Sequence, residues 1–313
     1  MNYKFFFNHT ALLFSFLTGL SGQGSALYFH NRKNNFLKKI EVLTNQQKNL
    51  LKIFFRIYTK YYPDLPYIFY FENSKKDLQK ELKKLLTAQE FQQINQILAN
   101  FKPVFEEIYK KERLKLVERK KKLKYISKEK KYVSVLLKFF NLENKKNVKR
   151  ILYRIFISIN NESINDCAGL YWGDNNVSLE ISDCPIKNLK YVFGGILMHE
   201  IAHDFFKRSF VYNNFKKFCD NLKSNRSLNK IITKYKLTKI DLIEEMIITS
   251  ITPEGYFYKK YFGKLPTKTD VIKFEHLRKK VGMALAPTLQ NYIKNNKSID
   301  KNYFEIVVSA ITS

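Results

Sequence analysis

Two histidines and a glutamate stand at a spacing that is typical of zinc-binding helices. The stretch "GGILMHEIAHDFF" places His199 four residues before His203, with Glu200 directly after the first histidine. Residues four apart on a helix lie on one face, with Cβ atoms about 5–6 Å apart. Both imidazoles can therefore reach one ion at about 2.0–2.1 Å. Glu200 points about a quarter-turn away, where its carboxylate can serve as general base toward a water activated by the ion.

The HExxH pattern is short, and many proteins contain it by accident. This chain has only 5 histidines among 313 residues, so an accidental pair in this register is uncommon. Apolar residues flank the motif, which predicts a buried helix: Ile196, Leu197, Ile201, Ala202 and Phe205. The sequence therefore predicts one zinc ion here. The alternative is a pair of histidines on an ordinary core or surface helix.

A catalytic zinc needs a third protein ligand and one open position. The metzincin pattern would require Gly at 206 and His at 209, but this chain has Phe206 and Ser209. The remaining common source is an acid on a later helix. The segment "KIDLIEEMIITSITPEGYF" supplies Glu244 and Glu245 in an apolar stretch, where a carboxylate is costly to bury without a partner. Either acid is a candidate, and we expect at least one of them to face solvent.

The two motifs together resemble the glutamate zincins, or gluzincins. More narrowly, they resemble an uncharacterised family of bacterial metallopeptidases that is defined by a domain of unknown function. In that family a strand precedes the HExxH helix, and the third ligand is the Glu of an E-x-x-[apolar]-x-[small] helix. The resemblance implies Glu245 as the ligand, with Ile248 and Ser250 at the apolar and small positions. Glu244 would place Thr249 at the small position and fits less well.

The resemblance covers residues 135–260 at the level of motifs and implies zinc-dependent peptide hydrolysis. The chain departs from the family at Asp204, where a small polar residue is usual. We expect Asp204 to face solvent; the alternative is that it orients a zinc ligand.

A group that stabilises the tetrahedral oxyanion is also expected. The candidates are His276, Tyr256 and Tyr258, although each of them is more often a structural residue. Residues 177–182 could form a sheet edge on which an extended substrate lies.

Apolar periodicity predicts the elements that hold these residues. Helical spacing runs through residues 34–60 and 101–132 and continues into the HExxH motif from residue 186. Alternation predicts strands at 150–160 and 177–182, with a short strand at 67–71, and "NDCAGLYWGDNN" is rich in turn formers. We predict a mostly helical α+β fold. A basic helical region covers residues 27–145, and a zincin-like module of strand, active-site helix and glutamate helix lies in a catalytic domain at 146–313.

The first 26 residues have the layout of a secretory signal peptide. Lys4 precedes an apolar stretch that is densest from Ala11 to Leu20, and the small residues Gly24, Ser25 and Ala26 follow. We expect cleavage after Ala26 and export to the periplasm or the cell exterior. The alternatives are a buried N-terminal helix and an uncleaved anchor.

Three cysteines, Cys167, Cys184 and Cys219, have no metal-binding or redox spacing. In an exported chain Cys167 and Cys184 could form a disulfide; alternatively, all three are small buried hydrophobic residues.

The formal net charge is +28. The basic runs are mostly lysine without interleaved stacking aromatics, so we expect no specific nucleic-acid partner. The basic helix at 101–132 could contact an anionic envelope surface or could simply be a solvated face.

The sequence thus predicts an exported zinc metallopeptidase that acts on proteins or peptides. The alternative is a non-catalytic exported binding protein with a basic helical face and a structural or vestigial zinc site.

Overall fold

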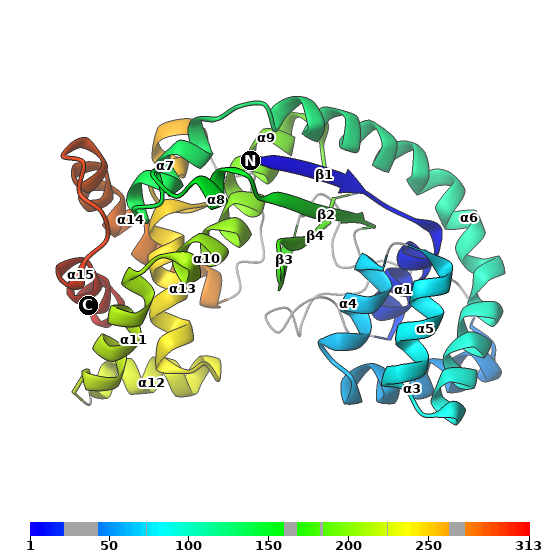
Figure 1. The fold of residues 1–313 in the computed structure, drawn as a ribbon. Helices are drawn as coiled ribbons and strands as arrows, with labels where there is room; N and C mark the ends of the chain where they lie inside the picture. The colour runs from blue at the N-terminus through cyan, green and yellow to red at the C-terminus, as the bar shows by residue number, and fades with distance from the viewer. Residues whose placement is uncertain (22–42, 73, 160–167, 182–183, 224, 263–272) are drawn as a thin grey trace. The chain divides into compact units, whose positions relative to one another are not determined.

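The computed structural model describes residues 1–21, 43–72, 74–159, 168–181, 184–223, 225–262 and 273–313. The chain is mostly helical with one small mixed sheet (Figure 1), so the predicted α+β class is confirmed. Two compact units are present. Unit 1 contains residues 1–2, 125–152 and 187–313, and unit 2 contains residues 3–124 and 153–186. This division does not follow the predicted boundary near residue 145, because the strands after that point group with the N-terminal helices.

The four-stranded sheet has the order β1-β2-β4-β3, and its strands are β1 (Asn2–Phe6), β2 (Leu152–Ser158), β3 (Ala168–Gly173) and β4 (Asn176–Glu180). β2 and β4 are parallel, with Ile157 opposite Leu179, whereas β3 and β4 are antiparallel. All five residues of β4 are buried, as in a strand that is covered on both faces. β4 has a neighbour on each side, so the expectation that residues 177–182 form a free edge for substrate is wrong.

β3 lies in the stretch for which only turns were expected. The turn itself is short: Gly173, Asp174 and Asn175 all have positive φ, at 88°, 45° and 62°. Gly, Asp and Asn adopt this conformation most readily, and positive φ at both central residues suits a tight hairpin. Trp172 Nε1 donates to Ser178 Oγ across the pair at 2.8 Å. The sequence therefore correctly indicated a turn, and this turn joins the strands β3 and β4.

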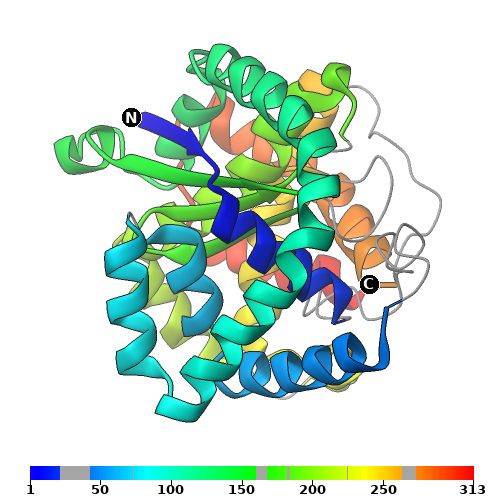
Figure 2. The same cartoon turned by 90° about the vertical axis from the view of Figure 1, so that its right-hand side faces the viewer.

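The helices of unit 2 are α1 (His9–Leu20), α3 (Asn45–Lys60), α4 (Asp64–Phe71), α5 (Lys75–Leu85) and α6 (Ala88–Ile126). α1 is mostly apolar, and all of its residues from Ala11 to Leu20 are buried. The Phe14 ring stacks on Phe69 of α4 with centroids 4.0 Å apart, and Phe16 lies 5.5 Å from Phe105 of α6. Figure 2 shows α1 running beside α6. α1 thus belongs to the core of this unit.

The predicted strand at residues 67–71 is wrong, because this segment belongs to helix α4. Its aromatic and β-branched residues favour a strand locally. Burial at helical spacing overrides that preference: Leu65 and Phe69 are buried one turn apart. Pro66 stands in the first turn, where a missing N–H costs no intrahelical bond. Tyr70 packs on Phe156 of β2 with ring centroids 4.7 Å apart.

The predicted signal peptide overlaps β1 and α1. Cleavage after Ala26 would remove one strand of the sheet and a buried helix, and it stays a prediction. Within the described ranges, no helix is both long enough and apolar enough to cross a bilayer.

We expect Phe14→Ala to lower the free energy of unfolding of the intact chain by about 3–5 kcal/mol, because it would leave a cavity beneath Phe69. Chemical denaturation measures the change, and the mass of the purified protein shows whether Met1 is retained. Phe55→Ala on the exposed side of α3 is the matched control, with an expected cost of no more than about 0.5 kcal/mol. A purified chain that begins at residue 27 would support the cleaved signal instead.

The helical elements of unit 1 surround α13 (Lys239–Ile251), which has only a few exposed positions. A capping box at Thr238 and Asp241 begins α13. α13 contacts α10, α14 and α15, and Figure 1 shows α10 alongside it.

The remaining helical elements from residue 131 onward are α7 (Lys131–Phe139), α8 (Lys146–Lys149), η1 (Ile186–Asn188), α9 (Leu189–Tyr191), the π-helix η2 (Val192–Leu197), α10 (Met198–Arg208), α11 (Val211–Asn221), α12 (Arg226–Tyr235), η3 (Tyr258–Phe262), α14 (Lys273–Lys294) and α15 (Lys301–Thr312).

Cys184 and Cys219 are buried free thiols. The candidate bridge from Cys184 is therefore not formed in the structure, and Cys167 lies outside the described residues. The backbone carbonyl of Cys184 accepts a hydrogen bond from Arg119 Nε at 3.1 Å.

Candidate metal centre

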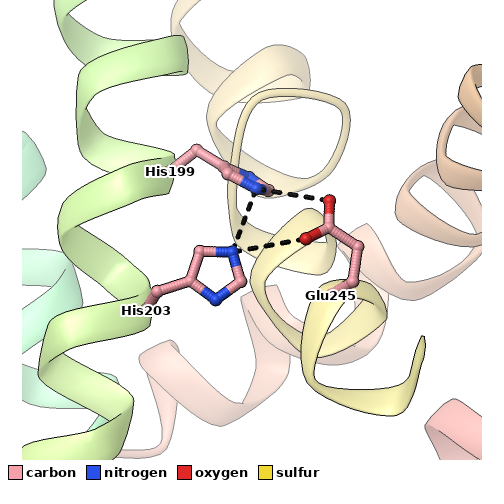
Figure 3. Close-up of side chains that lie close together, drawn as sticks. All are labelled: His199, His203 and Glu245. Atoms are coloured by element: carbon pink, nitrogen blue, oxygen red, sulfur yellow. Dashed lines mark hydrogen bonds and ion pairs between the residues drawn. The ribbon is translucent and has the colours of Figure 1, made fainter. Parts of the chain in front are cut away.

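Helices α10 and α13 bring His199, His203 and Glu245 together (Figure 3). The two histidines share one face of α10, as their spacing predicted, and Glu245 reaches them from α13. Each residue offers one ligand atom, and these atoms all lie within 4.8 Å of one another. The His199 side chain is 7% exposed, that of His203 17% and that of Glu245 12%. Residues far apart in the chain therefore form one shielded cluster.

The two imidazole nitrogens have the separation of ligands on one ion, and each faces a different oxygen of Glu245. The two Nε2 atoms are 3.3 Å apart, His199 Nε2 is 3.3 Å from Glu245 Oε1, and His203 Nε2 is 3.3 Å from Glu245 Oε2. Ligands about 2.0 Å from a tetrahedral zinc ion are separated by about 3.3 Å. Two imidazole nitrogens and a carboxylate are also a ligand set that zinc favours. The residues thus fit zinc in both geometry and chemistry.

The other ring nitrogen of each histidine contacts an acceptor. His199 Nδ1 lies 2.8 Å from the carbonyl oxygen of Thr252, and His203 Nδ1 lies 2.8 Å from Glu244 Oε1. A carbonyl or carboxylate oxygen accepts, so each Nδ1 must carry the proton and donate it. In a neutral imidazole this leaves the Nε2 lone pair facing the cluster. Such contacts orient the metal-binding histidines of proteins.

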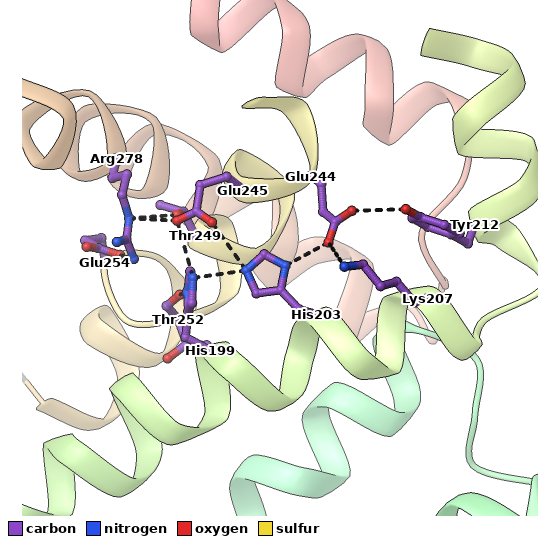
Figure 4. A network of polar contacts seen from close by, with 10 residues as sticks. All are labelled: His199, His203, Lys207, Tyr212, Glu244, Glu245, Thr249, Thr252, Glu254 and Arg278. Carbon is purple, nitrogen blue, oxygen red and sulfur yellow. Dashed lines mark hydrogen bonds and ion pairs between the residues drawn. The ribbon is translucent and has the colours of Figure 1, made fainter. Parts of the chain in front are cut away.

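Glu244 does not join the cluster but lies on the opposite side of the His203 ring (Figure 4). The expectation that one of the two adjacent acids faces solvent is wrong, since Glu244 is only 5% exposed. Its burial is compensated by several partners. Besides His203, Tyr212 donates to its Oε2 at 3.3 Å, and Lys207 Nζ lies 3.5 Å from Oε1. The structure thus gives Glu244 a supporting position and places Glu245 at the cluster.

The buried charges shift the pKa values of the cluster. Burial alone would raise the pKa of Glu245, but the electrostatic interactions with His199 and Arg278 hold it well below its usual range. Burial lowers the pKa of His203, but hydrogen bonds with Glu244 and Glu245 outweigh it and raise the pKa to about 10. Without a metal, His203 therefore carries a proton at neutral pH.

We expect zinc binding near pH 7 to release the proton of His203, because only a neutral imidazole can bind the ion. The pKa of about 10 means that the proton is still bound below that pH. Zinc affinity should therefore rise by about tenfold per pH unit from neutral pH toward pH 10. Titration calorimetry in two buffers of different ionisation enthalpy counts the protons released. Glu244→Gln should lower the pKa of His203, so fewer protons should be released per zinc ion at pH 8. Equal zinc affinity at pH 7 and pH 9 would contradict the expectation.

Arg278 and Glu254 were not identified from the sequence. Arg278 Nε lies 3.2 Å from Glu245 Oε1, and Arg278 Nη2 lies 3.4 Å from Glu254 Oε2. Burial disfavours the charged guanidinium, but Glu254 and Glu245 outweigh it and raise the pKa of Arg278; Glu200 acts in the same direction. Glu200 is half-buried on α10. The only sequence signal for Arg278 was an arginine within a helix that is otherwise rich in lysine.

Within the described part of the chain, none of the three candidate oxyanion groups forms a hydrogen bond with His199, His203 or Glu245. His276 is exposed on α14. It precedes Arg278 by two residues, so its side chain points about 200° around the helix axis from that of Arg278, which faces Glu245. Tyr256 is buried, and its hydroxyl accepts a hydrogen bond from Lys260 Nζ at 2.7 Å. Tyr258 begins η3 and is partly exposed. A catalytic role for these three residues stays a prediction.

The expectation that Asp204 faces solvent is wrong. Asp204 is only 5% exposed, and Arg208 Nε donates to its Oδ2 at 2.7 Å. Its position therefore suits a structural ion pair along α10.

The loop after α13 fixes Thr252 beside α10. The Thr252 hydroxyl donates to the carbonyls of Gly194 and Gly195, at 2.9 and 3.0 Å. Both acceptors lie in the π-helix η2, whose wider turn often occurs at functional sites. Gly194 permits close packing here, because a Cβ atom would lie 2.6 Å from the Tyr132 ring.

We expect Gly255→Ala to destabilise this loop, because the new Cβ would lie 1.8 Å from the carbonyl oxygen of Ser250. The backbone must move to relieve this overlap, which should cost about 1–3 kcal/mol or more of unfolding free energy. Denaturation of metal-free protein measures the change. Gly173→Asn in the β3–β4 turn is the comparison: the new side chain meets open space, so only the strain of its positive φ acts, which Asn bears better than most residues. An unchanged Gly255→Ala protein would contradict the packing described.

No protein-family model, curated protein or solved structure matches this chain.

Proposed function

We propose that this chain is a zinc-dependent hydrolase that cleaves peptide bonds, with His199, His203 and Glu245 as zinc ligands and Glu200 as the general base. The observation that carries the proposal is the convergence of three ligand-bearing residues, whose two imidazole nitrogens have the separation expected around a tetrahedral zinc ion. Oriented Nδ1 atoms support it, since each histidine has a fixed acceptor behind it. The peptide substrate rests on the gluzincin resemblance of the two motifs.

When bound, zinc would polarise the scissile carbonyl and lower the pKa of a water molecule to about 7. Glu200 accepts one proton as the water oxygen attacks the carbonyl carbon. It then delivers that proton to the amide nitrogen as the C–N bond breaks, which yields a carboxylic acid and an amine. Glu244 and Thr252 keep the two imidazoles in the tautomer that this arrangement needs.

The number of ligands supports a catalytic rather than a structural ion. Structural zinc sites have four protein ligands, whereas catalytic sites have three and an open position. The cluster found among the described residues has three members. Glu244, the nearest further acid in sequence, is bound to the Nδ1 side of His203 instead.

The direct test is metal analysis of the purified chain together with hydrolysis of a quenched peptide library. We expect near-stoichiometric zinc, and peptide cleavage that a chelator stops. His203→Ala should remove the zinc, whereas His276→Ala, at an exposed position outside the cluster, should retain it. A wild-type chain that folds but holds no zinc after incubation with the ion would refute the proposal.

A second candidate function is contact with an anionic surface through α6. Leu114 is 74% exposed and Val117 is 49% exposed on this helix. Exposed basic residues accompany them: Lys110, Lys111, Arg113, Lys120 and Lys121. Apolar side chains among lysines suit the interface of an anionic membrane, where each lysine contributes about 1 kcal/mol. This role is compatible with the hydrolase and is also what the non-catalytic alternative would use.

Co-sedimentation with phosphatidylglycerol vesicles tests this surface. We expect the intact chain to bind at low salt and to be released as salt screens the lysines. The double variant Lys120→Gln/Lys121→Gln should weaken binding by about tenfold or more. Lys75→Gln/Lys76→Gln, an exposed pair on α5, removes the same charge elsewhere. Equal losses in both pairs would show that only net charge matters.

A further inference from the structure

Arg278 occupies a position between two acids that no sequence motif explains. It extends from α14 toward α13, and its Nε also donates to the Thr249 hydroxyl at 3.3 Å. Gly282, one turn later, allows the two segments to approach closely: a Cβ atom there would lie 3.0 Å from Glu254 Cβ. The guanidinium is thus held by groups of α13 and of the loop that follows it (Figure 4).

The two oxygens of Glu245 have different surroundings. Oε1 is 3.2 Å from Arg278 Nε and 3.3 Å from His199 Nε2, whereas Oε2 is 3.3 Å from His203 Nε2. An arginine keeps its charge at any relevant pH, so its ion pair with Oε1 persists. A carboxylate oxygen that is paired with a cation has less electron density to offer a metal. Arg278 therefore makes Oε1 the weaker ligand atom and leaves Oε2 as the stronger one.

We infer that Arg278 is a positioning residue that keeps Glu245 monodentate and so preserves the open coordination position. The inference rests on the proposed zinc site. A carboxylate that bound through both oxygens would occupy the place that a catalytic ion needs for water or substrate. Glu254 supports this role, since its contact with Nη2 fixes the plane of the guanidinium. The side chain of Arg278 is 21% exposed, so bulk water only partly competes for these bonds.

Cobalt(II) substitution tests the inference, because four-coordinate cobalt absorbs visible light more strongly than five-coordinate cobalt. The wild-type chain should give strong bands. Arg278→Met should still bind cobalt but lose about half or more of the absorption per ion, because Glu245 becomes bidentate. Arg208→Met is the matched control: it removes an arginine that pairs with Asp204 on α10, and it should keep the wild-type bands.

The outcomes separate the inference from the proposed function. If the wild-type chain binds no cobalt or zinc, the metal site itself fails. If Arg278→Met binds cobalt with unchanged bands, the metal site stands and the role of Arg278 is overturned. Should that variant not fold, X-ray absorption of the zinc-loaded wild-type chain decides: four ligands support the inference, and a second oxygen from a carboxylate overturns it.

Discussion

Glu245→Gln should abolish stoichiometric zinc binding, whereas Glu244→Gln should retain the ion with affinity reduced by about 10–100-fold. The two acids are adjacent in sequence and both lie in the interior, yet they face different sides of His203. Glu245 would contribute a ligand oxygen, and an amide oxygen is a far poorer ligand for zinc than a carboxylate. Glu244 acts only through the imidazole, so its loss weakens the orientation and basicity of His203 but leaves three ligands.

Competition with a fluorescent zinc chelator measures both affinities on protein whose circular dichroism matches the wild type. The pair provides its own control, because each substitution removes one negative charge from the same turn of α13. Equal losses would mean that Glu245 has no special role. A reversed order would make Glu244 the third ligand and would require α13 to rotate relative to the position seen in the structure.

Glu200→Gln should retain zinc at wild-type stoichiometry and lower kcat for peptide hydrolysis by about 10²–10⁴-fold, the usual contribution of a general base. Glutamine has the size of glutamate but cannot accept the proton of the attacking water. Because Glu200 is not a member of the metal-binding group, the zinc-induced rise in thermal stability should persist. That rise reports on zinc binding independently of turnover.

The result divides the candidate functions. A wild-type chain that cleaves peptides and a Glu200→Gln chain that does not, with equal zinc content, support the hydrolase. Zinc binding in both chains without any turnover supports a vestigial site that holds peptides or has only a structural role. Unchanged cleavage in the variant would exclude Glu200 as the base.

The sequence was sufficient to predict that the two histidines of the HExxH motif share one helix face, because helical periodicity is a local property. A spacing of four places His199 and His203 on one side of any helix that contains them, and the apolar flanks predict its burial. The same local reasoning found β2 and β4 within a few residues and gave the α+β class. It also limited the third ligand to two adjacent acids in α13.

Periodicity could not choose between those acids, since neighbours on a helix point about 100° apart and either can face a partner. The gluzincin resemblance favoured Glu245, and the packing of α13 against α10 places it at the cluster. Packing also buries Glu244, because Tyr212 and Lys207 contact the side of its carboxylate that was expected to face solvent.

Elements whose local preference conflicts with their surroundings were missed. Residues 67–71 favour a strand by composition but are helical because their aromatic rings pack on α1 and β2. β3 was not predicted, because its sequence is rich in turn-forming residues. The pairing of β4 with a strand on each side could not be predicted either, since no local pattern indicates it.

The sequence by itself determined which groups are available for the proposed chemistry: two imidazoles in register, a carboxylate beside them and an acid on a later helix. Only the tertiary structure decided which of the two adjacent acids faces both imidazoles, and it alone brought Arg278 to Glu245 from 33 residues away in the chain. The physical reason is that helix periodicity fixes directions within one element. The distances between elements depend instead on how side chains fill the space between them, as Gly282 does by allowing α14 to approach α13.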